Sequence, residues 1–122
     1  MKITGLDHVQ LAIPKGGEDT ARAFYAGLLG MAEVAKPANL SPEGCWFESG
    51  SVSLHIGVDP KFSPATKAHP ALLVGNLSAL RQDLESAGIQ TKDDEPLDGY
   101  KRFFAKDPFG NRIEFMQKDE PT

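Results

Sequence analysis

The stretch LDHVQLAIPKGGEDTARAFYAGLLG, residues 6–30, decides how the chain is built. Apolar and polar side chains alternate in residues 6–13, which predicts a β-strand with one buried face. Residues 14–17 contain one proline and two glycines, and these end the strand. Apolar side chains then recur at helical spacing, which predicts a helix that stops at Gly30. The stretch therefore predicts a strand, a break and a helix, in that order.

The same order begins again at residue 69, where the strand HPALLV precedes the helix SALRQDLESAG, which ends at Gly88. The residues expected to cap the two helices are Asp19 or Thr20 in the first and Asn76 or Ser78 in the second. Short strands are expected after the helices in residues 32–34, 44–49, 52–58, 89–92, 102–106 and 111–117. The prediction is an α+β fold in one domain, residues 1–122, made of two βαβββ modules at about 1–60 and 66–118.

Composition narrows the class of protein. A chain of 122 residues, 40% hydrophobic and 25% charged, has the composition of an ordinary soluble domain. No apolar run approaches the roughly 18 residues that span a bilayer, and the first residues do not resemble a signal peptide. A net charge of −4 argues against a nucleic-acid partner. The single cysteine, Cys45, cannot form an internal disulfide, which favours the cytoplasm.

Four side chains that can bind a divalent metal occupy matching places in the two modules: His8 and His55 in the first, His69 and Glu114 in the second. The first pair is 47 positions apart and the second 45, and the chain has no other histidine. In each predicted strand the alternation places the candidate ligand opposite the apolar face that a helix would cover. A duplicated unit that supplies two ligands each time is the simplest explanation of this spacing.

Three imidazoles and one carboxylate suit Zn, Ni, Co, Mn or Fe(II) by ligand type. Four ligands in an octahedral field leave two positions that a substrate with oxygens on neighbouring atoms can fill, and the metal then acts as a Lewis acid. Without His55, the remaining His8, His69 and Glu114 would form the two-His-one-carboxylate set of Fe(II) oxygenases. Both alternatives use a small-molecule substrate.

The segments DHVQLAI, ARAFYAGLLGM, VSLHIGV, HPALLVGNLSALRQDLESAGI and DPFGNRIEFMQ together resemble the vicinal oxygen chelate superfamily. Glyoxalase I, fosfomycin-resistance enzymes, extradiol dioxygenases and bleomycin-resistance proteins belong to that group. The resemblance implies paired βαβββ modules that form a curved, cup-like mixed sheet with helices on its outer face. It implies one divalent metal, held here by His8, His55, His69 and Glu114.

The same resemblance implies three alternative functions. The first is a glyoxalase-like lyase or isomerase in which Glu114 shuttles a proton. The second is a non-enzymatic drug-binding protein of the bleomycin-resistance type, and the third is an Fe(II) extradiol-type dioxygenase. Short members often pair their modules between two chains, so the resemblance also implies a homodimer.

Candidate substrate-binding residues come from parity and composition. Gln10 and Ser53 share the ligand face of their strands, where they either line the cup or are surface polar residues. Arg102 and Lys101 either contact an anionic substrate or are exposed strand charges. The aromatic residues that either form the wall of a substrate pocket or pack in the core are Trp46, Phe47, Tyr100, Phe103 and Phe104.

Overall fold

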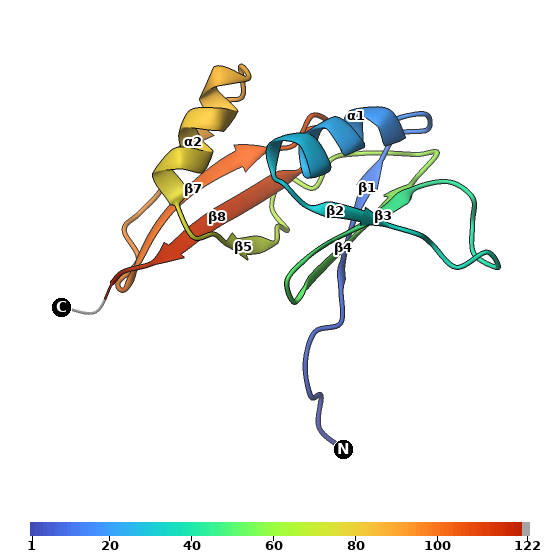
Figure 1. Cartoon of the computed structure of the whole chain (residues 1–122), viewed down its shortest axis with the longest axis horizontal. Coiled ribbons are helices and arrows are strands. Elements are labelled where there is room, and N and C mark those ends of the chain that lie inside the picture. The colour runs from blue at the N-terminus through green and yellow to red at the C-terminus, as the bar shows by residue number, and fades with distance from the viewer. Residues whose placement is uncertain (121–122) are drawn as a thin grey trace. The chain divides into compact units, whose positions relative to one another are not determined.

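Each half of the chain folds into a four-stranded mixed sheet with a helix on one face (Figure 1). The computed structural model describes residues 1–120, and the chain separates into two units that meet in sequence between Ser63 and Pro64. We call these units module 1 and module 2. The predicted α+β class and the βαβββ order of each module are confirmed. None of the helices in residues 1–120 is both long and apolar enough to cross a membrane.

Module 1 carries its sheet in the order β1-β4-β3-β2, with β1 parallel to β4 and the other neighbours antiparallel. The parallel pair forms because the chain crosses over through a helical segment before β2 to β4 return as antiparallel strands. The elements are β1 (Val9–Ile13), α1 (Glu18–Arg22), η1 (Ala23–Leu28), β2 (Ala32–Val34), β3 (Cys45–Ser49) and β4 (Val52–Val58).

The helical segment of module 1 differs in two ways from the prediction. Its first helical residue is Glu18 and its N-cap residue is Gly17, which has no side chain to cap the helix, so the expected cap by Asp19 or Thr20 is wrong. Asp19 lies inside the first turn and accepts a hydrogen bond from Arg22 instead. The second half of the helix, η1, is wound as a π-helix, and Gly30 ends the segment with a φ of 71° as expected.

Module 2 repeats the topology in the order β5-β8-β7-β6, again with the first strand parallel to the last. Its helix is capped by Asn76, whose side chain accepts a hydrogen bond from the Ala79 amide at 3.1 Å, as predicted. Gly88 ends the helix with a φ of 83°. The elements are β5 (Ala71–Leu73), α2 (Leu77–Ser86), β6 (Thr91–Lys92), β7 (Tyr100–Lys106) and β8 (Arg112–Lys118).

In each module, one face of the sheet packs under the helix and forms the core. In module 1, Phe47 is fully buried and lies 5.8 Å, between ring centroids, from Tyr25 of η1. In module 2, Phe103 is fully buried beneath Arg81 of α2. The other core side chains on these helix-covered faces include Leu11, Ile13, Leu54, Ile56, Ile113 and Phe115.

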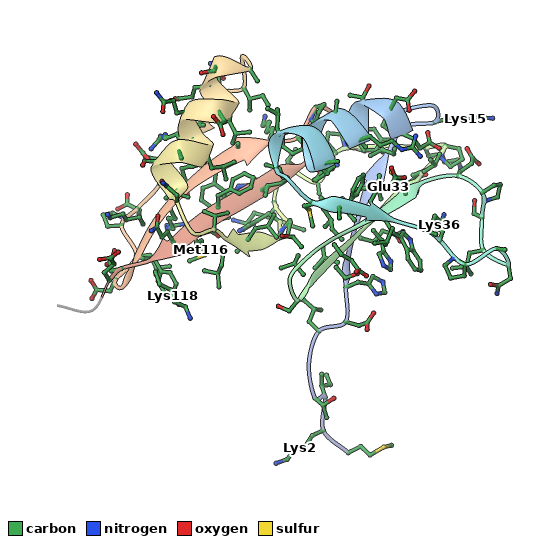
Figure 2. All side chains as sticks on the ribbon, viewed as in Figure 1. Lys2, Lys15, Glu33, Lys36, Met116 and Lys118 are labelled. Atoms are coloured by element: carbon green, nitrogen blue, oxygen red, sulfur yellow. The ribbon has the colours of Figure 1, made fainter. Side chains whose placement is uncertain are left out.

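Alternate residues project from the opposite side of each sheet, which we call the helix-free face. Figure 2 shows Met116 and Lys118 projecting from β8 on the side away from α2. Glu114 has the same parity and therefore lies on the same face. In module 1 the strand register places Gln10, Trp46 and His55 side by side on the helix-free face. The candidate ligands within strands thus lie on the faces that the helices leave uncovered.

Candidate metal centre

The two candidate ligands of module 1 form part of a stack of aromatic rings. The imidazole of His55, on β4, is flanked by the ring of His8 just before β1 and by the indole of Trp46 on β3. The ring centroids of His8 and His55 are 4.0 Å apart, and those of Trp46 and His55 are 3.8 Å apart with planes inclined by 2°. Because β4 lies between β1 and β3 in the sheet, His55 is held between the other two rings.

The surroundings of His55 favour a neutral imidazole. Burial, and then the neighbouring charge of His8, lower the pKa of His55 below its ordinary value. His8 has its Nδ1 2.9 Å from a carboxylate oxygen of Asp7, which leaves its Nε2 without that contact. A carboxylate on one ring nitrogen fixes the tautomer and directs the other nitrogen toward a ligand or metal. Metals bind the neutral form of imidazole, so the lowered pKa of His55 suits that role, and the contact of His8 with Asp7 suits it by orientation.

The candidate ligands of module 2 are in direct polar contact. His69 lies two residues before β5, yet its Nε2 is 3.1 Å from Oε1 of Glu114 on β8. Its Nδ1 is 3.0 Å from the carbonyl oxygen of Lys67, an acceptor, so Nδ1 carries a proton. The remaining Nε2 lone pair and the carboxylate oxygen repel each other unless a proton or a cation lies between them.

The separation of these two atoms also fits a shared ion. With metal–ligand distances of about 2.0–2.2 Å, two ligands at right angles around one ion are roughly 3 Å apart. The distance between His69 Nε2 and Glu114 Oε1, 3.1 Å, matches that value. The donor set and spacing of module 2 therefore fit a divalent metal.

Arg102 holds the second oxygen of the Glu114 carboxylate. Its Nη1 donates to Oε2 of Glu114 at 3.1 Å, and its Nη2 donates to the carbonyl oxygen of Glu95 at 2.6 Å. Glu114 is only 7% exposed, and a buried carboxylate is costly unless it is paired. Arg102 therefore pairs with the buried Glu114 carboxylate and fixes its orientation, as partners of metal-binding carboxylates do.

Most of the other residues predicted for the site line one of two cavities. Gln10, Ser53 and Trp46 line a cavity of about 600 Å³ next to His8 and His55. Tyr100, Lys101 and Arg102 line a different cavity of about 370 Å³ in module 2.

Phe47 and Phe103 lie elsewhere, because both are fully buried on the helix-covered faces. Of the two alternatives for these rings, core packing describes them, and we leave them out of the site. Lys101 lines the same cavity as Arg102, but it is exposed and has the opposite parity on β7.

Three contacts of the site involve residues that the sequence pattern did not single out. They are the Asp7 carboxylate at His8, the Lys67 carbonyl at His69, and Arg112, whose Nη1 is 3.4 Å from Nδ1 of His69. The sequence does contain a signal for two of them: Asp7 adjoins a candidate ligand, and Arg112 shares the strand parity of Glu114. The Lys67 contact depends on a loop conformation that no periodicity encodes.

Each module thus brings two candidate ligands together. Among residues 1–120 no group of three or more His, Cys, Asp or Glu side chains is gathered where it could hold one ion. Two ligands from one module leave most of a coordination sphere to be filled.

Both the sequence and the fold of this chain are similar to those of known proteins. The family model of the Glyoxalase/Bleomycin resistance protein/Dioxygenase superfamily matches residues 5–115. A glyoxalase family protein from Bacillus anthracis has 47% sequence identity and a TM-score of 0.91, with 98% of each chain covered. A search of curated protein sequences gave no match.

Two more distant structures share the fold. The fosfomycin resistance protein FosX from Listeria monocytogenes has a TM-score of 0.71 at 17% identity, covering 99% of this chain and 96% of its own. The antibiotic-binding protein TnmS3 from Streptomyces sp. CB03234 has a TM-score of 0.74 at 18% identity, covering 98% of this chain and 99% of its own.

Proposed function

Because the chain belongs to the Glyoxalase/Bleomycin resistance protein/Dioxygenase superfamily, we propose that it is a metal-dependent lyase or isomerase for a small oxygenated substrate. The observation that carries the proposal is the contact between His69 Nε2 and Glu114 Oε1, which has the separation of two ligands on one ion. The proposed ligands are His8, His55, His69 and Glu114, and the ion is Zn, Ni, Co, Mn or Fe(II). When bound, the ion would supply Lewis-acid stabilisation of a developing enolate or alkoxide.

The protein groups have distinct proposed roles. Glu114 has Oε1 as its free oxygen, because Arg102 holds the other; this oxygen would leave the ion before it accepted a proton from the substrate. His55 stays neutral at physiological pH because burial lowers its pKa. The cavity beside it, lined by Gln10, Ser53 and Trp46, receives part of the substrate and excludes water from it.

The number of ligands in each module also bears on assembly. One module supplies two of the four proposed ligands, so a full set requires a module 1 and a module 2 around one ion. We propose that the modules of two chains pair in this way in a homodimer. Size-exclusion chromatography with light scattering, with and without the metal, tests this part of the proposal.

Elemental analysis of protein made without a histidine tag tests the metal directly. Stoichiometric Zn, Ni, Co or Mn, together with a rise in melting temperature when the metal is restored, supports the proposal. The Glu114→Gln variant should lose the metal, whereas Glu43→Gln, on an exposed residue of the loop before β3, should keep it. Protein that neither contains metal nor is stabilised by any of these ions would overturn the proposal. Stoichiometric iron with oxygen uptake on a catechol would favour the dioxygenase alternative.

A drug-binding protein is the second candidate function. Two observations favour it: the cavity of module 1 has an indole stacked in its wall, and one structural neighbour is an antibiotic-binding protein. An aromatic ligand could stack on Trp46 without any metal. Ligand affinity that is unchanged after treatment with EDTA, with no turnover, would favour this function over the first.

A further inference from the structure

Positive charge is concentrated on the helix-free face of module 2, although the whole chain has a net charge of −4. The strand register places Lys92 beside Phe104 and Lys106 beside Arg112 on this face. Arg102 has the same parity on β7 but is already paired with Glu114. The strand residues of the corresponding face in module 1 include no lysine or arginine. The basic face is therefore a property of one module and not of the repeated fold.

Three of these cations line one cavity. It has a volume of about 560 Å³, and Lys92, Lys106 and Arg112 lie in its wall together with one carboxylate, Asp94. Asp94 is ionised at neutral pH, because a backbone hydrogen bond from Glu95 lowers its pKa. Three positive charges and one negative charge leave an excess of two, which an anion in the cavity would neutralise.

The guanidinium of Arg112 lies in the cavity wall but makes no short hydrogen bond or ion pair. It lies over the Phe104 ring, 3.9 Å from the ring centroid, which orients its N–H groups sideways. Its nearest acceptors are Lys67 O at 3.5 Å and Asp94 Oδ2 at 3.7 Å, and Nδ1 of His69, at 3.4 Å, carries a proton and cannot accept from it. All three exceed the 2.7–3.2 Å usual for N–H···O hydrogen bonds. A guanidinium that is three-quarters buried, at 25% exposure of its side chain, normally has closer partners.

We propose that this cavity is an oxyanion subsite, and that the substrate is a small molecule carrying a phosphate-like or carboxylate group. Arg112 would donate two N–H groups to the anion, and Lys92 and Lys106 would supply the remaining charge. The inference rests on the proposed function, because Arg112 also reaches His69 and so joins the subsite to the proposed metal ligands. A doubly charged tetrahedral group matches the charge excess better than a carboxylate does.

Binding of inorganic anions to metal-free protein tests the subsite apart from the metal. Calorimetry at low ionic strength with phosphate, sulfate and acetate should show the tightest binding for phosphate. Arg112→Gln should weaken phosphate binding at least about tenfold, as expected for loss of charge-assisted hydrogen bonds. Lys106→Gln, on an exposed side chain, should weaken it about threefold. The matched control Lys101→Gln, exposed on β7 with the opposite parity, should have no effect.

The outcomes separate this inference from the proposed function. Phosphate affinity that is equal in Arg112→Gln and the unmodified chain, or lowered equally by Lys101→Gln, overturns the subsite. Because the titration uses metal-free protein, phosphate binding can succeed even if the metal proposal fails. Conversely, Lys106→Gln, which changes no contact of a proposed ligand, should retain the metal affinity of the unmodified chain, and normal metal binding without any phosphate binding would refute the subsite alone.

Discussion

Modules 1 and 2 have the same strand order, yet their helix-free faces are chemically different. In module 1 the two proposed ligands are imidazoles that stack on each other, and an indole covers the other face of His55. In module 2 they are an imidazole and a carboxylate held by polar contacts with Lys67 and Arg102. The repeated topology fixes where a ligand can be placed, and the neighbouring side chains decide how it is held. The position of a ligand in the sheet and the side chains that hold it can therefore vary independently.

Removing the carboxylate of module 2 should have the largest effect. We expect Glu114→Gln to lower the affinity for Zn by about 100-fold or more, because an amide is a poor ligand for this ion and the ion loses a negative charge. The guanidinium of Arg102 would also lose its ionic partner. Competition with a chromophoric chelator measures the affinity, and a decrease smaller than threefold would show that Glu114 is not a ligand.

The support of that carboxylate should matter next. Arg102→Gln leaves every proposed ligand in place but frees Oε2 of Glu114. We expect a 10- to 100-fold decrease in metal affinity, the usual cost of losing an outer partner of a metal ligand. Lys101→Gln serves as the control on the same strand. If both variants bind metal like the unmodified chain, then Arg102 does not position Glu114.

Breaking the stack in module 1 should affect stability more than metal affinity. Trp46→Ala removes the indole that covers one face of His55. Loss of this stacking and of apolar contact should lower the free energy of unfolding by about 1–2 kcal/mol. Trp46→Phe should restore roughly half of the loss. Urea denaturation measures both variants, and an unchanged midpoint in Trp46→Ala would contradict a supporting role for the stack.

The smallest expected effect is a dependence of stability on pH. The pKa of His55 is lowered in the folded state, so in acid the unfolded state binds more protons and is favoured. Stability linked to His55 is therefore complete above the unfolded pKa of about 6.5 and decreases as the pH falls below it. We expect His55→Gln to have a shallower pH dependence between pH 7 and 5. Identical slopes for the two proteins would contradict the assignment.

The alternation in residues 6–13 and 52–58 was sufficient to predict which face of each strand is buried, and hence the ligand faces in module 1. Contacts across strands were harder to predict. The stack of Trp46 on His55 depends on a register set by the turn at Ser49 and Gly50, which alternation does not encode. Adjacent aromatic residues illustrate the same limit, because Trp46 lies in the cavity wall and Phe47 in the core.

Module 2 shows a second limit. Pro70 precedes β5, so His69 lies outside the strand and its parity alone could not place the ring. The contact with Glu114 arises from the loop that also brings the Lys67 carbonyl to the ring. Strand parity predicts that Arg102 and Arg112 lie on the same face as Glu114. The groups that these two arginines contact depend on side-chain conformations, which parity does not predict. Sequence therefore gives the scaffold and the faces, and the structure gives the partners.

Trp46 is the sole tryptophan of the chain, and it lies against a proposed ligand. The intrinsic fluorescence of the protein consequently comes mainly from an indole whose quantum yield responds to whatever happens at the adjoining imidazole. Unlabelled protein can thus be screened against ions and candidate substrates in a cuvette, with emission as the readout.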